Sequence, residues 1–280
     1  MPLVFVPTPL GNLRDITIRS LDTLRACDLL IAEDTRVAAR LLAGLGLPPK
    51  PTRSYREQNA DRATPMILEA ARVSLVAVTS DAGTPAISDP GSQLIAAARE
   101  AGVAVELLPG PCALVGAIAL SGFEHQRFSF EGFAPRTSVL RRRAFRRALD
   151  SGAPSVWYEA PHRFHSALRD LVAEEPLARI FFLREYTKLH EEQRLATAAD
   201  LLAMLPETLR GEIAFVVEPR PAKAKQAPSP LQIEAAINEL FSQGLSTAQV
   251  AKRLCAEGYG TRAELYAHAN KVREREPTAL

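Results

Sequence analysis

The sequence has 280 residues, of which 47% are hydrophobic and 24% charged, and its formal net charge is +2. This composition is typical of a soluble globular protein, the length predicts about two domains, and so small a net charge favours no particular partner. No apolar run approaches the ~18 residues of a membrane-spanning helix, the N-terminus lacks the features of a signal peptide, and the cysteines are too scattered for a disulfide framework or a zinc site. We therefore expect a cytoplasmic protein with reduced thiols and no membrane segment.

Apolar runs and amphipathic runs alternate through the first 122 residues. Short apolar runs predict strands at residues 3–6, 29–32, 51–55, 75–79 and 103–108. Helical spacing predicts a helix that starts at Asp15 or Thr17, a second that ends near Leu42, and others at residues 59–71, 92–100 and 113–120. Regular alternation of strand and helix indicates a mostly parallel sheet with both faces covered. We predict one α/β domain over residues 1–122.

The pattern changes after Gly122. Strands are predicted at residues 128–133, 155–159, 180–183 and 212–218, with helices at residues 139–149, 163–173 and 197–205. These elements predict a second α/β domain over residues 123–219. Residues 220–230 are rich in proline and lack bulky apolar side chains, which is typical of a linker. Residues 231–280 are expected to form a small helical domain with helices at 231–243, 247–257 and 261–275.

Several predicted strands of the first domain end in loops rich in glycine, proline and acidic residues. These loops are residues 7–12, 33–36, 80–91 and 109–112. The carboxyl ends of parallel strands meet at one edge of a sheet, and ligands bind there in open α/β folds. Loop 80–91 is therefore predicted to line a small-molecule site, the alternative being an ordinary strand-to-helix loop. The chain lacks the glycine patterns of a dinucleotide fold or a P-loop, so an adenosine-like or amino-acid-like cofactor fits better than a triphosphate.

Two clusters in the second domain also follow predicted strands, at residues 158–163 and 184–188. Each places Arg and Glu within a few residues, which fits either a salt bridge or the opposite wall of a ligand cleft. His162 and His165 lie three residues apart with no cysteine nearby, so we expect a hydrogen-bonding role for His162 and no metal site. The sequence has no G-x-S-x-G segment, which disfavours a hydrolase.

Six arginines crowd the segment before and within the predicted helix 139–149. They are Arg136, Arg141, Arg142, Arg143, Arg146 and Arg147. A solvated helix face is the usual explanation for such a run of charge. Arginine also forms forked hydrogen bonds to phosphates, so we favour binding of RNA or another polyanion.

The strand-end segments together resemble a known family. They are residues 7–16 (PTPLGNLRDI), 32–36 (AEDTR), 80–91 (SDAGTPAISDPG), 108–113 (LPGPCA), 158–163 (YEAPHR) and 184–188 (REYTK). In this order they resemble the ribosomal RNA small subunit methyltransferase I family, within the tetrapyrrole-methylase-like (class III) methyltransferases that use S-adenosylmethionine. The resemblance covers nearly all of residues 1–219, and residues 260–266 (GTRAELY) are similar to the family's C-terminal helical domain.

The resemblance implies transfer of a methyl group from S-adenosylmethionine to the ribose 2′-oxygen of a cytidine in the decoding region of 16S rRNA, within the 30S subunit. It also implies a cofactor cleft between two α/β domains and a homodimer. The residues expected to bind the cofactor are Pro7, Leu10, Gly11, Asp81, Ala82, Gly83, Ile87, Ser88, Asp89, Pro109, Gly110, Pro111, Glu212 and Ala214. Many relatives carry histidine where this chain has residues 54–59 (SYREQN), so no catalytic histidine is expected there.

Methylation of a 2′-hydroxyl needs a base, or an electrostatic partner for the developing alkoxide. The carboxylate candidates are Glu33, Asp34, Glu159 and Glu185. The residues expected to contact RNA are Arg36, His162, Arg163, Lys188 and the six crowded arginines. Our hypothesis is that Asp34 and Glu159 orient the ribose while Arg36 and Arg163 bind phosphate. Two alternatives remain: a methyltransferase of the same fold acting on a small molecule or a protein, and a non-enzymatic RNA-binding protein.

Overall fold

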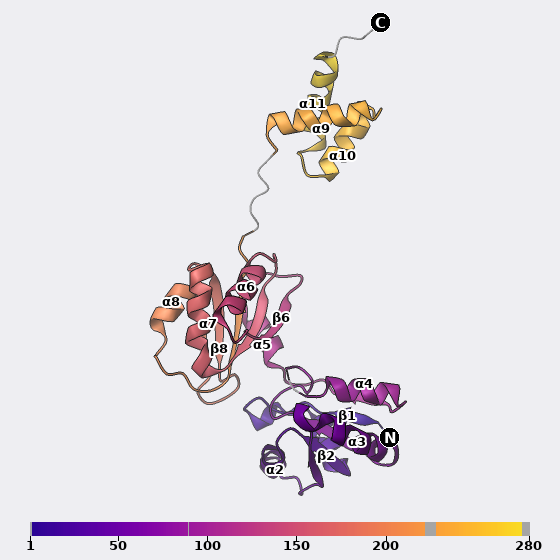
Figure 1. The fold of residues 1–280 in the computed structure, drawn as a ribbon, viewed down its shortest axis with the longest axis vertical. Coiled ribbons are helices and arrows are strands. Elements are labelled where there is room, and N and C mark those ends of the chain that lie inside the picture. The colour runs from indigo at the N-terminus through magenta and orange to yellow at the C-terminus, as the bar shows by residue number, and fades with distance from the viewer. Residues whose placement is uncertain (1, 89, 222–227, 276–280) are drawn as a thin grey trace. The chain divides into compact units, whose positions relative to one another are not determined.

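The computed structural model describes residues 2–88, 90–221 and 228–275, and the side chains of these residues up to Glu274. Asp89 and part of the predicted linker, residues 222–227, lie outside the described residues. The chain divides into two compact units, Met1–Pro219 and Arg220–Leu280 (Figure 1). The predicted α/β class is confirmed, because helices and strands alternate along the first unit. The predicted boundaries at residues 122 and 230 stay predictions.

The first unit contains a five-stranded sheet with strand order β3-β2-β4-β1-β5, and all of its pairings are parallel. Its strands are β1 (Leu3–Phe5), β2 (Leu29–Ala32), β3 (Thr52–Ser54), β4 (Val76–Thr79) and β5 (Val105–Leu107). The helices that accompany them are α1 (Ile18–Ala26), α2 (Thr35–Gly44), α3 (Ala60–Val73) and α4 (Ser92–Glu100), with short 3₁₀ turns at Leu13–Asp15 and Glu57–Asn59.

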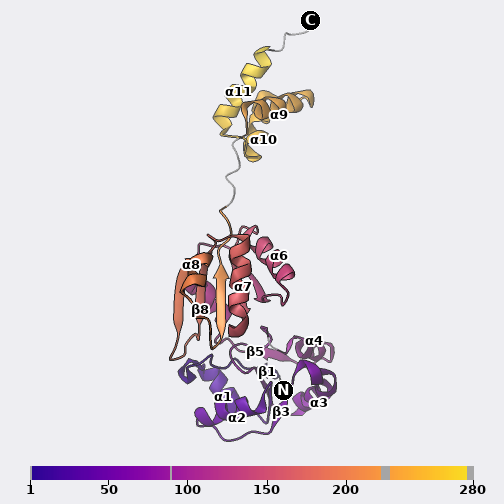
Figure 2. The ribbon, with the colours of Figure 1, turned by 60° about the vertical axis from the view of Figure 1, so that its left-hand side comes forward.

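Alternate side chains of the central strands enter two separate cores. Leu3 and Phe5 pack with residues of α3 and α4, whereas Val4 packs with residues of α1 and α2. Successive side chains of a strand point to opposite faces, so a strand that is apolar at every position requires a cover on both faces. Figure 2 shows α1 and α2 on one side of this sheet and α3 and α4 on the other.

A second five-stranded sheet follows, with strand order β6-β7-β10-β8-β9. Its strands are β6 (Ser129–Phe133), β7 (Ser155–Glu159), β8 (Arg179–Arg184), β9 (Glu192–Thr197) and β10 (Ile213–Val217). Only β6 and β7 pair in parallel, and the remaining pairs are antiparallel. The register shifts between Phe130 and Gly132, and the positive φ of Gly132 (67°) allows the bulge there.

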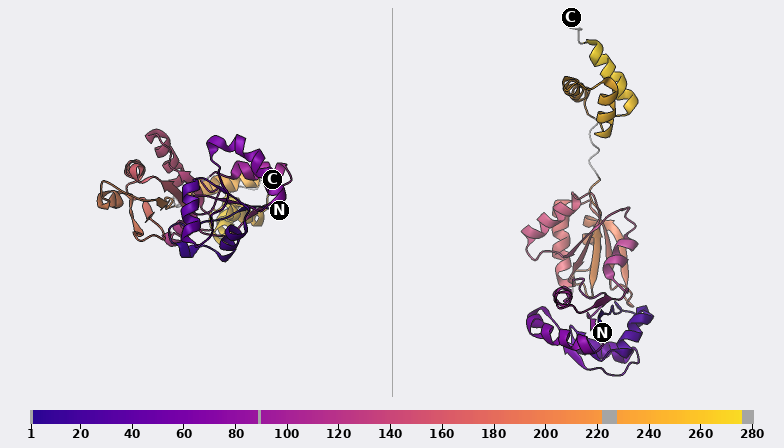
Figure 3. Two further views of the ribbon diagram at one scale, coloured as in Figure 1. Left: turned by 90° about the horizontal axis from the view of Figure 1, so that it is seen from below. Right: turned by 90° about the vertical axis from the view of Figure 1, so that its right-hand side faces the viewer.

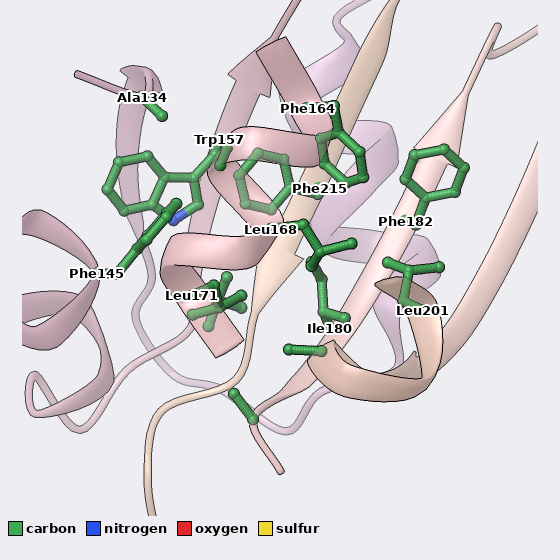
Figure 4. Packing of buried hydrophobic residues seen from close by; sticks show 14 of the residues in the cluster. Ala134, Phe145, Trp157, Phe164, Leu168, Leu171, Ile180, Phe182, Leu201 and Phe215 are labelled. Atoms are coloured by element: carbon green, nitrogen blue, oxygen red, sulfur yellow. The ribbon is translucent and has the colours of Figure 1, made fainter. Parts of the chain in front are cut away.

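An aromatic core fills the space between the second sheet and its helices α6 (Ser138–Leu149), α7 (Pro161–Glu174) and α8 (Ala198–Met204). Figure 4 shows Trp157 beside Phe145 and Phe215. The Trp157 and Phe215 rings stack at 6.2 Å between centroids, and Phe145 meets Trp157 edge-on at 5.0 Å. Such aromatic pairs add about 0.5–1.5 kcal/mol beyond the burial of their surface.

Helix α5 (Ala113–Ser121) covers the opposite face of the second sheet. Its Ala117 and Ile118 pack on Val156, Phe181 and Val216. From the sequence, this helix was assigned to the first domain, but in the structure it packs on the second sheet. The loop before it, residues 109–112, therefore leads from the first sheet to the second.

The second unit has three helices, α9 (Pro230–Ser242), α10 (Thr247–Ala256) and α11 (Arg262–Arg275), which form a small bundle (Figure 3). Ser229 and Ser246 start α9 and α10 with capping boxes. Ile237, Val250 and Leu265 lie in an apolar core that is separate from the cores of the first unit. Within the described parts of the chain, no helix is long and apolar enough to cross a bilayer.

Candidate functional site

A cavity of about 350 Å³ lies between loops of the first sheet and strand ends of the second. It is lined by Leu10, Ala82, Gly83, Thr84, Ile87, Ser88, Cys112, Ala113, Phe133, Tyr158, Glu159, Ala160, Pro161, Leu183, Tyr186, Gly211, Glu212, Ile213 and Ala214. The lining is mainly apolar with few charged side chains, and its size falls in the range of small-molecule sites.

The loop after β4 is held against the loop after β1 by backbone hydrogen bonds. Thr8 N–H donates to the Gly83 carbonyl at 2.9 Å, and Gly83 N–H donates back to Thr8 at 3.1 Å. The Thr84 hydroxyl donates to the Pro111 carbonyl at 2.8 Å, which joins a third loop to the other two. Three loops that are distant in sequence thus form one wall of the cavity.

Two glycines in this wall are required by close contacts. A Cβ on Gly83 would meet Leu10 Cδ2 at 2.9 Å, and a Cβ on Gly110 would meet Pro7 Cβ at 2.4 Å. Ala86 and Ser88, in the same loop as Gly83, have positive φ angles of 68° and 59°. Strained backbone of this kind persists only where the surrounding structure enforces it, and it is enriched at ligand sites.

Half of the residues predicted to bind the cofactor line the cavity directly. They are Leu10, Ala82, Gly83, Ile87, Ser88, Glu212 and Ala214. Pro7, Gly110 and Pro111 lie behind them as packing and hydrogen-bonding partners. Gly11 lies under the Lys188 side chain, and Asp81 accepts a hydrogen bond from Asp34 N–H at 3.1 Å. Pro109 is not among the lining residues, and Asp89 lies outside the described residues.

The sequence interpretation missed several lining residues, including Cys112, Ala113, Leu183 and Gly211. Tyr186 was also missed, although it lies inside the cluster 184–188. Its ring packs against Gly116 of α5, where a Cβ would come within 2.4 Å. The sequence shows an apolar helix that contains Gly116 and an aromatic residue, Tyr186, after a strand. It does not show that the two are in contact.

Glu159 ends β7 and is the most buried carboxylate at the cavity, with a side chain that is 0% exposed. Its Oε1 accepts a hydrogen bond from Ala160 N–H at 2.8 Å. Its Oε2 lies 3.2 Å from Arg163 Nη2 and makes no hydrogen bond among the described residues. Burial raises the pKa of Glu159 against the opposing effects of the Ala160 N–H and Arg163. One carboxylate oxygen is therefore left with capacity to accept a proton or a hydroxyl group.

Asp34 is a different kind of carboxylate. It caps α2 through Arg36 N–H at 2.8 Å and pairs with the Arg36 guanidinium at 2.6 Å. The hydrogen bonds from the Arg36 side chain and backbone hold the pKa of Asp34 well below its usual range. Asp34 is not among the cavity-lining residues. A carboxylate held so firmly ionised is a weak base, so Asp34 suits positioning better than proton transfer.

The pKa values of Glu33 and Glu185 are shifted in opposite directions. Burial, helped by the charge of Asp81, raises the pKa of Glu33. Burial acts in the same direction on Glu185, but hydrogen bonds from Lys188 and from Glu212 N–H outweigh it, so the pKa of Glu185 is lowered. Lys188 bridges Glu185 and Glu212 at 2.8 and 2.9 Å. The four carboxylate candidates thus separate into two with raised pKa values, Glu33 and Glu159, and two with lowered ones.

Arg141 is a correction to the predicted RNA-binding set. Its side chain is 6% exposed, pairs with Asp170 and donates to the carbonyls of Pro135 and Arg136. Its position on the inner face of α6 explains its burial, so Arg141 joins α6 to α7 and is not available to RNA.

The other crowded arginines are exposed, but several have partners. Arg142 and Arg146 both pair with Glu174, at 2.7 and 2.8 Å, and Arg147 pairs with Glu131 at 2.8 Å. Arg136 and Arg143 are exposed and form no ion pair within the described part of the chain. His162 is exposed in the first turn of α7, and Arg163 donates to the Ala134 carbonyl. The described residues contain no cluster of His, Cys, Asp and Glu that could hold a metal ion.

Comparison with known proteins identifies the class of protein to which this chain belongs. Residues 2–202 match the family model of Tetrapyrrole (Corrin/Porphyrin) Methylases. Among solved structures, diphthine synthase aligns with a TM-score of 0.60 over 78% of this chain and 90% of that one, at 16% identity. Uroporphyrin III C-methyltransferase from Thermus thermophilus aligns with a TM-score of 0.54 over 78% and 97%, also at 16% identity. The chain belongs to the tetrapyrrole methylase family, and these two structures share its fold.

Proteins with similar sequences identify the particular family within this class. A protein of Escherichia coli O157:H7 named ribosomal RNA small subunit methyltransferase I is 38% identical over 231 residues, 81% of each chain. Proteins of the same name from Thermotoga maritima (44% identical, 68% of this chain and 85% of the relative) and Synechocystis sp. (34%, 94% and 95%) are similar. The chain is thus a member of the ribosomal RNA small subunit methyltransferase I family, and the resemblance seen in the sequence is confirmed.

Proposed function

We propose that the protein transfers the methyl group of S-adenosylmethionine to the ribose 2′-hydroxyl of a cytidine in the decoding region of 16S rRNA, within the 30S subunit. The observation that carries this proposal is Glu159, a buried carboxylate in the lining of a cofactor-sized cavity, whose Oε2 faces Arg163 at 3.2 Å but accepts no hydrogen bond among the described residues. The names of the relatives supply the RNA class.

The cavity fits S-adenosylmethionine in size and in chemistry. Gly83 and Gly110 let the loops of the cavity wall pack closely, and the mostly apolar walls match an adenosine and a sulfonium better than a triphosphate. Leu10, Gly83 and Ser88 from the first sheet, with Glu212 and Ala214 from the second, would hold the cofactor. When bound, it supplies an activated methyl group, so alignment with the acceptor oxygen provides much of the rate.

Glu159 then has the role of accepting the 2′-hydroxyl proton. When the sulfonium's S–CH3 bond breaks and the cofactor leaves as a neutral thioether, Glu159 Oε2 would take the proton released from the methylated ribose oxygen. A raised pKa makes this carboxylate a better proton acceptor than an ordinary Glu, and Arg163 at 3.2 Å stabilises its ionised form before transfer. Asp34 orients Arg36 through their ion pair, and the Arg36 side chain, which is 84% exposed, would contact a phosphate.

Exposed cations outside the cavity are proposed to bind the RNA backbone. Arg136 and Arg143 have no ion-pair partner among the described residues, so they contact phosphates without breaking an existing pair. Arg142, Arg146 and Arg147 would have to exchange Glu174 or Glu131 for phosphate. His162 and Lys188 remain further candidates. The homodimer expected from the family and the cytoplasmic location expected from the sequence stay predictions.

The test compares three variants in single-turnover methylation of 30S subunits. Glu159→Gln is expected to reduce turnover by about 10²–10⁴-fold, the usual contribution of a positioned base, while S-adenosylmethionine affinity stays within a few-fold. Asp34→Asn is expected to act mainly on RNA affinity. Glu207→Gln, an exposed carboxylate away from the cavity, is the control. Unchanged turnover in Glu159→Gln would rule out its role as the base, and unchanged RNA affinity in Asp34→Asn would rule out the role given to Asp34.

A methyltransferase of the same fold that acts on a small molecule is the competing function. The diphthine synthase and uroporphyrin methyltransferase structures share the fold at 16% identity, which carries no argument for their substrates. Methylation of a corrin precursor in place of 30S subunits would favour that function.

A further inference from the structure

A second pocket, of about 760 Å³, opens on the first sheet's side of the molecule. Its polar lining includes Glu33, Tyr55, Arg56, Gln58, Ser92 and Gln93. Ser88 lines both this pocket and the cofactor cavity. A group bound in the second pocket therefore lies next to the proposed cofactor cavity.

Tyr55 is the first sign that this pocket receives a ligand. The residue is only 3% exposed and its ring belongs to the core under α3 and α4, yet it also lines the pocket. Its hydroxyl has no hydrogen-bond partner among the described residues. Buried hydroxyl groups are nearly always paired, so the hydroxyl of this pocket-lining residue is a candidate donor to a ligand.

The start of α4 supplies a second set of donors. Gly91, the N-cap residue of α4, has a φ of 147° and no side chain with which to cap the helix. Ser92 and Gln93, the first two residues of α4, line the pocket. Backbone N–H groups in the first turn of a helix have no partner within the helix, so they donate to whatever occupies the space in front of them.

The charged side chains that line the pocket favour a neutral ligand over an anion. Glu33 and Glu57 both line the pocket, and Asp81 is close enough to act on Glu33. Arg56 is partly neutralised, because its Nε donates to the Glu33 carbonyl at 2.8 Å and its Nη2 lies 3.5 Å from Asp34. A phosphate would meet an excess of negative charge. A neutral ring with an amino group on one edge and acceptor atoms beside it matches the lining better.

We propose that this pocket binds the base of the nucleotide that is methylated, and that Glu33 makes it selective for cytosine. The Glu33 carboxylate accepts a hydrogen bond from the exocyclic amino group, while the Tyr55 hydroxyl and the first N–H groups of α4 donate to the ring's O2 and N3 atoms. Uracil presents a carbonyl oxygen in place of the amino group, which the carboxylate repels. Enzymes that act on one nucleotide commonly read its base in such a pocket, outside the base stack. This inference rests on the proposed function.

The test uses two sets of 30S subunits that carry cytidine or uridine at the target position. The wild-type protein is expected to prefer cytidine. Glu33→Gln is expected to lower the cytidine-to-uridine ratio of kcat/KM by about tenfold or more, because an amide can donate to the uracil oxygen. Tyr55→Phe keeps the ring in the core and is expected to lower kcat/KM for both subunits by about tenfold, with the ratio unchanged. Glu69→Gln, an exposed carboxylate on α3, is the control and should leave both values unchanged.

S-adenosylmethionine affinity and thermal unfolding of each variant separate these effects from damage to the cofactor site or the fold. A Glu33→Gln variant that folds, binds cofactor and keeps the wild-type ratio overturns the base-reading role of Glu33. Tyr55→Phe with wild-type kcat/KM on both subunits overturns the pocket as the base site. If the wild-type protein methylates neither subunit but binds cofactor, the proposed function itself fails.

Discussion

Gly83 offers a direct test of the cofactor cavity. At its φ of 81° any L-residue is strained, and a Cβ would meet Leu10 Cδ2 at 2.9 Å. Gly102, just after α4, makes a matched control because its φ is +67° and nothing lies within 4 Å of its Cβ position. Gly83→Ala and Gly102→Ala therefore share the backbone strain, but only Gly83→Ala pushes a side chain at the cavity wall.

The shared strain amounts to about 1–2 kcal/mol for an L-residue in the left-handed region. For a unit of this size, each 1 kcal/mol lowers Tm by about 2–4 °C, so both variants should lose about 2–8 °C. Leu10 is half-buried and lines the cavity, so in Gly83→Ala it moves into the space of the cofactor. A loss of about 1.4 kcal/mol in binding corresponds to a tenfold rise in Kd.

The assay is titration calorimetry with S-adenosylmethionine, alongside differential scanning calorimetry of both variants. The expected result is a similar fall in Tm for the two variants and at least a tenfold weaker affinity for Gly83→Ala alone. Wild-type affinity in Gly83→Ala would refute the placement of the cofactor against this loop. Equal loss of affinity in Gly102→Ala would show that strain, not the contact with Leu10, is responsible.

Three further predictions concern charged side chains. Arg141→Ala leaves the half-buried Asp170 without its cationic partner, with only the hydrogen bond from Ser138, and should cost about 3 kcal/mol in urea unfolding. Arg143→Ala should leave stability unchanged and reduce the salt dependence of RNA binding by about one ion. Hydrogen bonds from Arg146 and Arg142 lower the pKa of Glu174 in the folded protein. Ionised Glu174 therefore stabilises the fold at pH values above its ordinary pKa, and this stabilisation is lost as the pH falls through its lowered pKa. Glu174→Gln should accordingly be less stable than the wild type at neutral pH and equally stable in acid. Because burial raises the pKa of Glu159, the methylation rate should fall with decreasing pH from a point above the ordinary Glu value of 4.5, and Glu159→Gln should lack that decline.

The arrangement of the first sheet could be predicted because its signals are local. The buried strands β1, β2 and β4 are short runs of apolar residues, and the loops after β1 and β4 are rich in glycine or proline. Parallel strands direct such loops to one edge, so the wall formed by residues 80–88 and its neighbours followed from the sequence.

The edge of the second sheet could not be predicted in the same way. Strand β9 (Glu192–Thr197) is polar and mostly exposed, and it has no apolar alternation to mark it. It exists because its backbone pairs with β8 from Arg179↔Thr197 to Arg184↔Glu192. Pairing with a neighbouring strand is a tertiary effect that overrides local preference.

The burial of Arg141 could not be predicted for a related reason. The partners of its cations, Asp170, Glu174 and Glu131, lie 16 to 32 residues away in α7 and β6. The sequence of helix α6 alone contains the positive charges but not their acidic partners. Packing of α6 on α7 buries Arg141 and neutralises part of the rest, which leaves Arg136 and Arg143 as the exposed cations without ion-pair partners among the described residues.

The most direct test of the central claim is mass mapping of 16S rRNA after incubation of unmethylated 30S subunits with the protein and S-adenosylmethionine. We predict a single added methyl group, located on the ribose of one cytidine in a decoding-region fragment, and its absence in the Glu159→Gln reaction. A methyl group on a base, methylation elsewhere in the RNA, or no methylation of subunits by a protein that binds the cofactor would contradict the account.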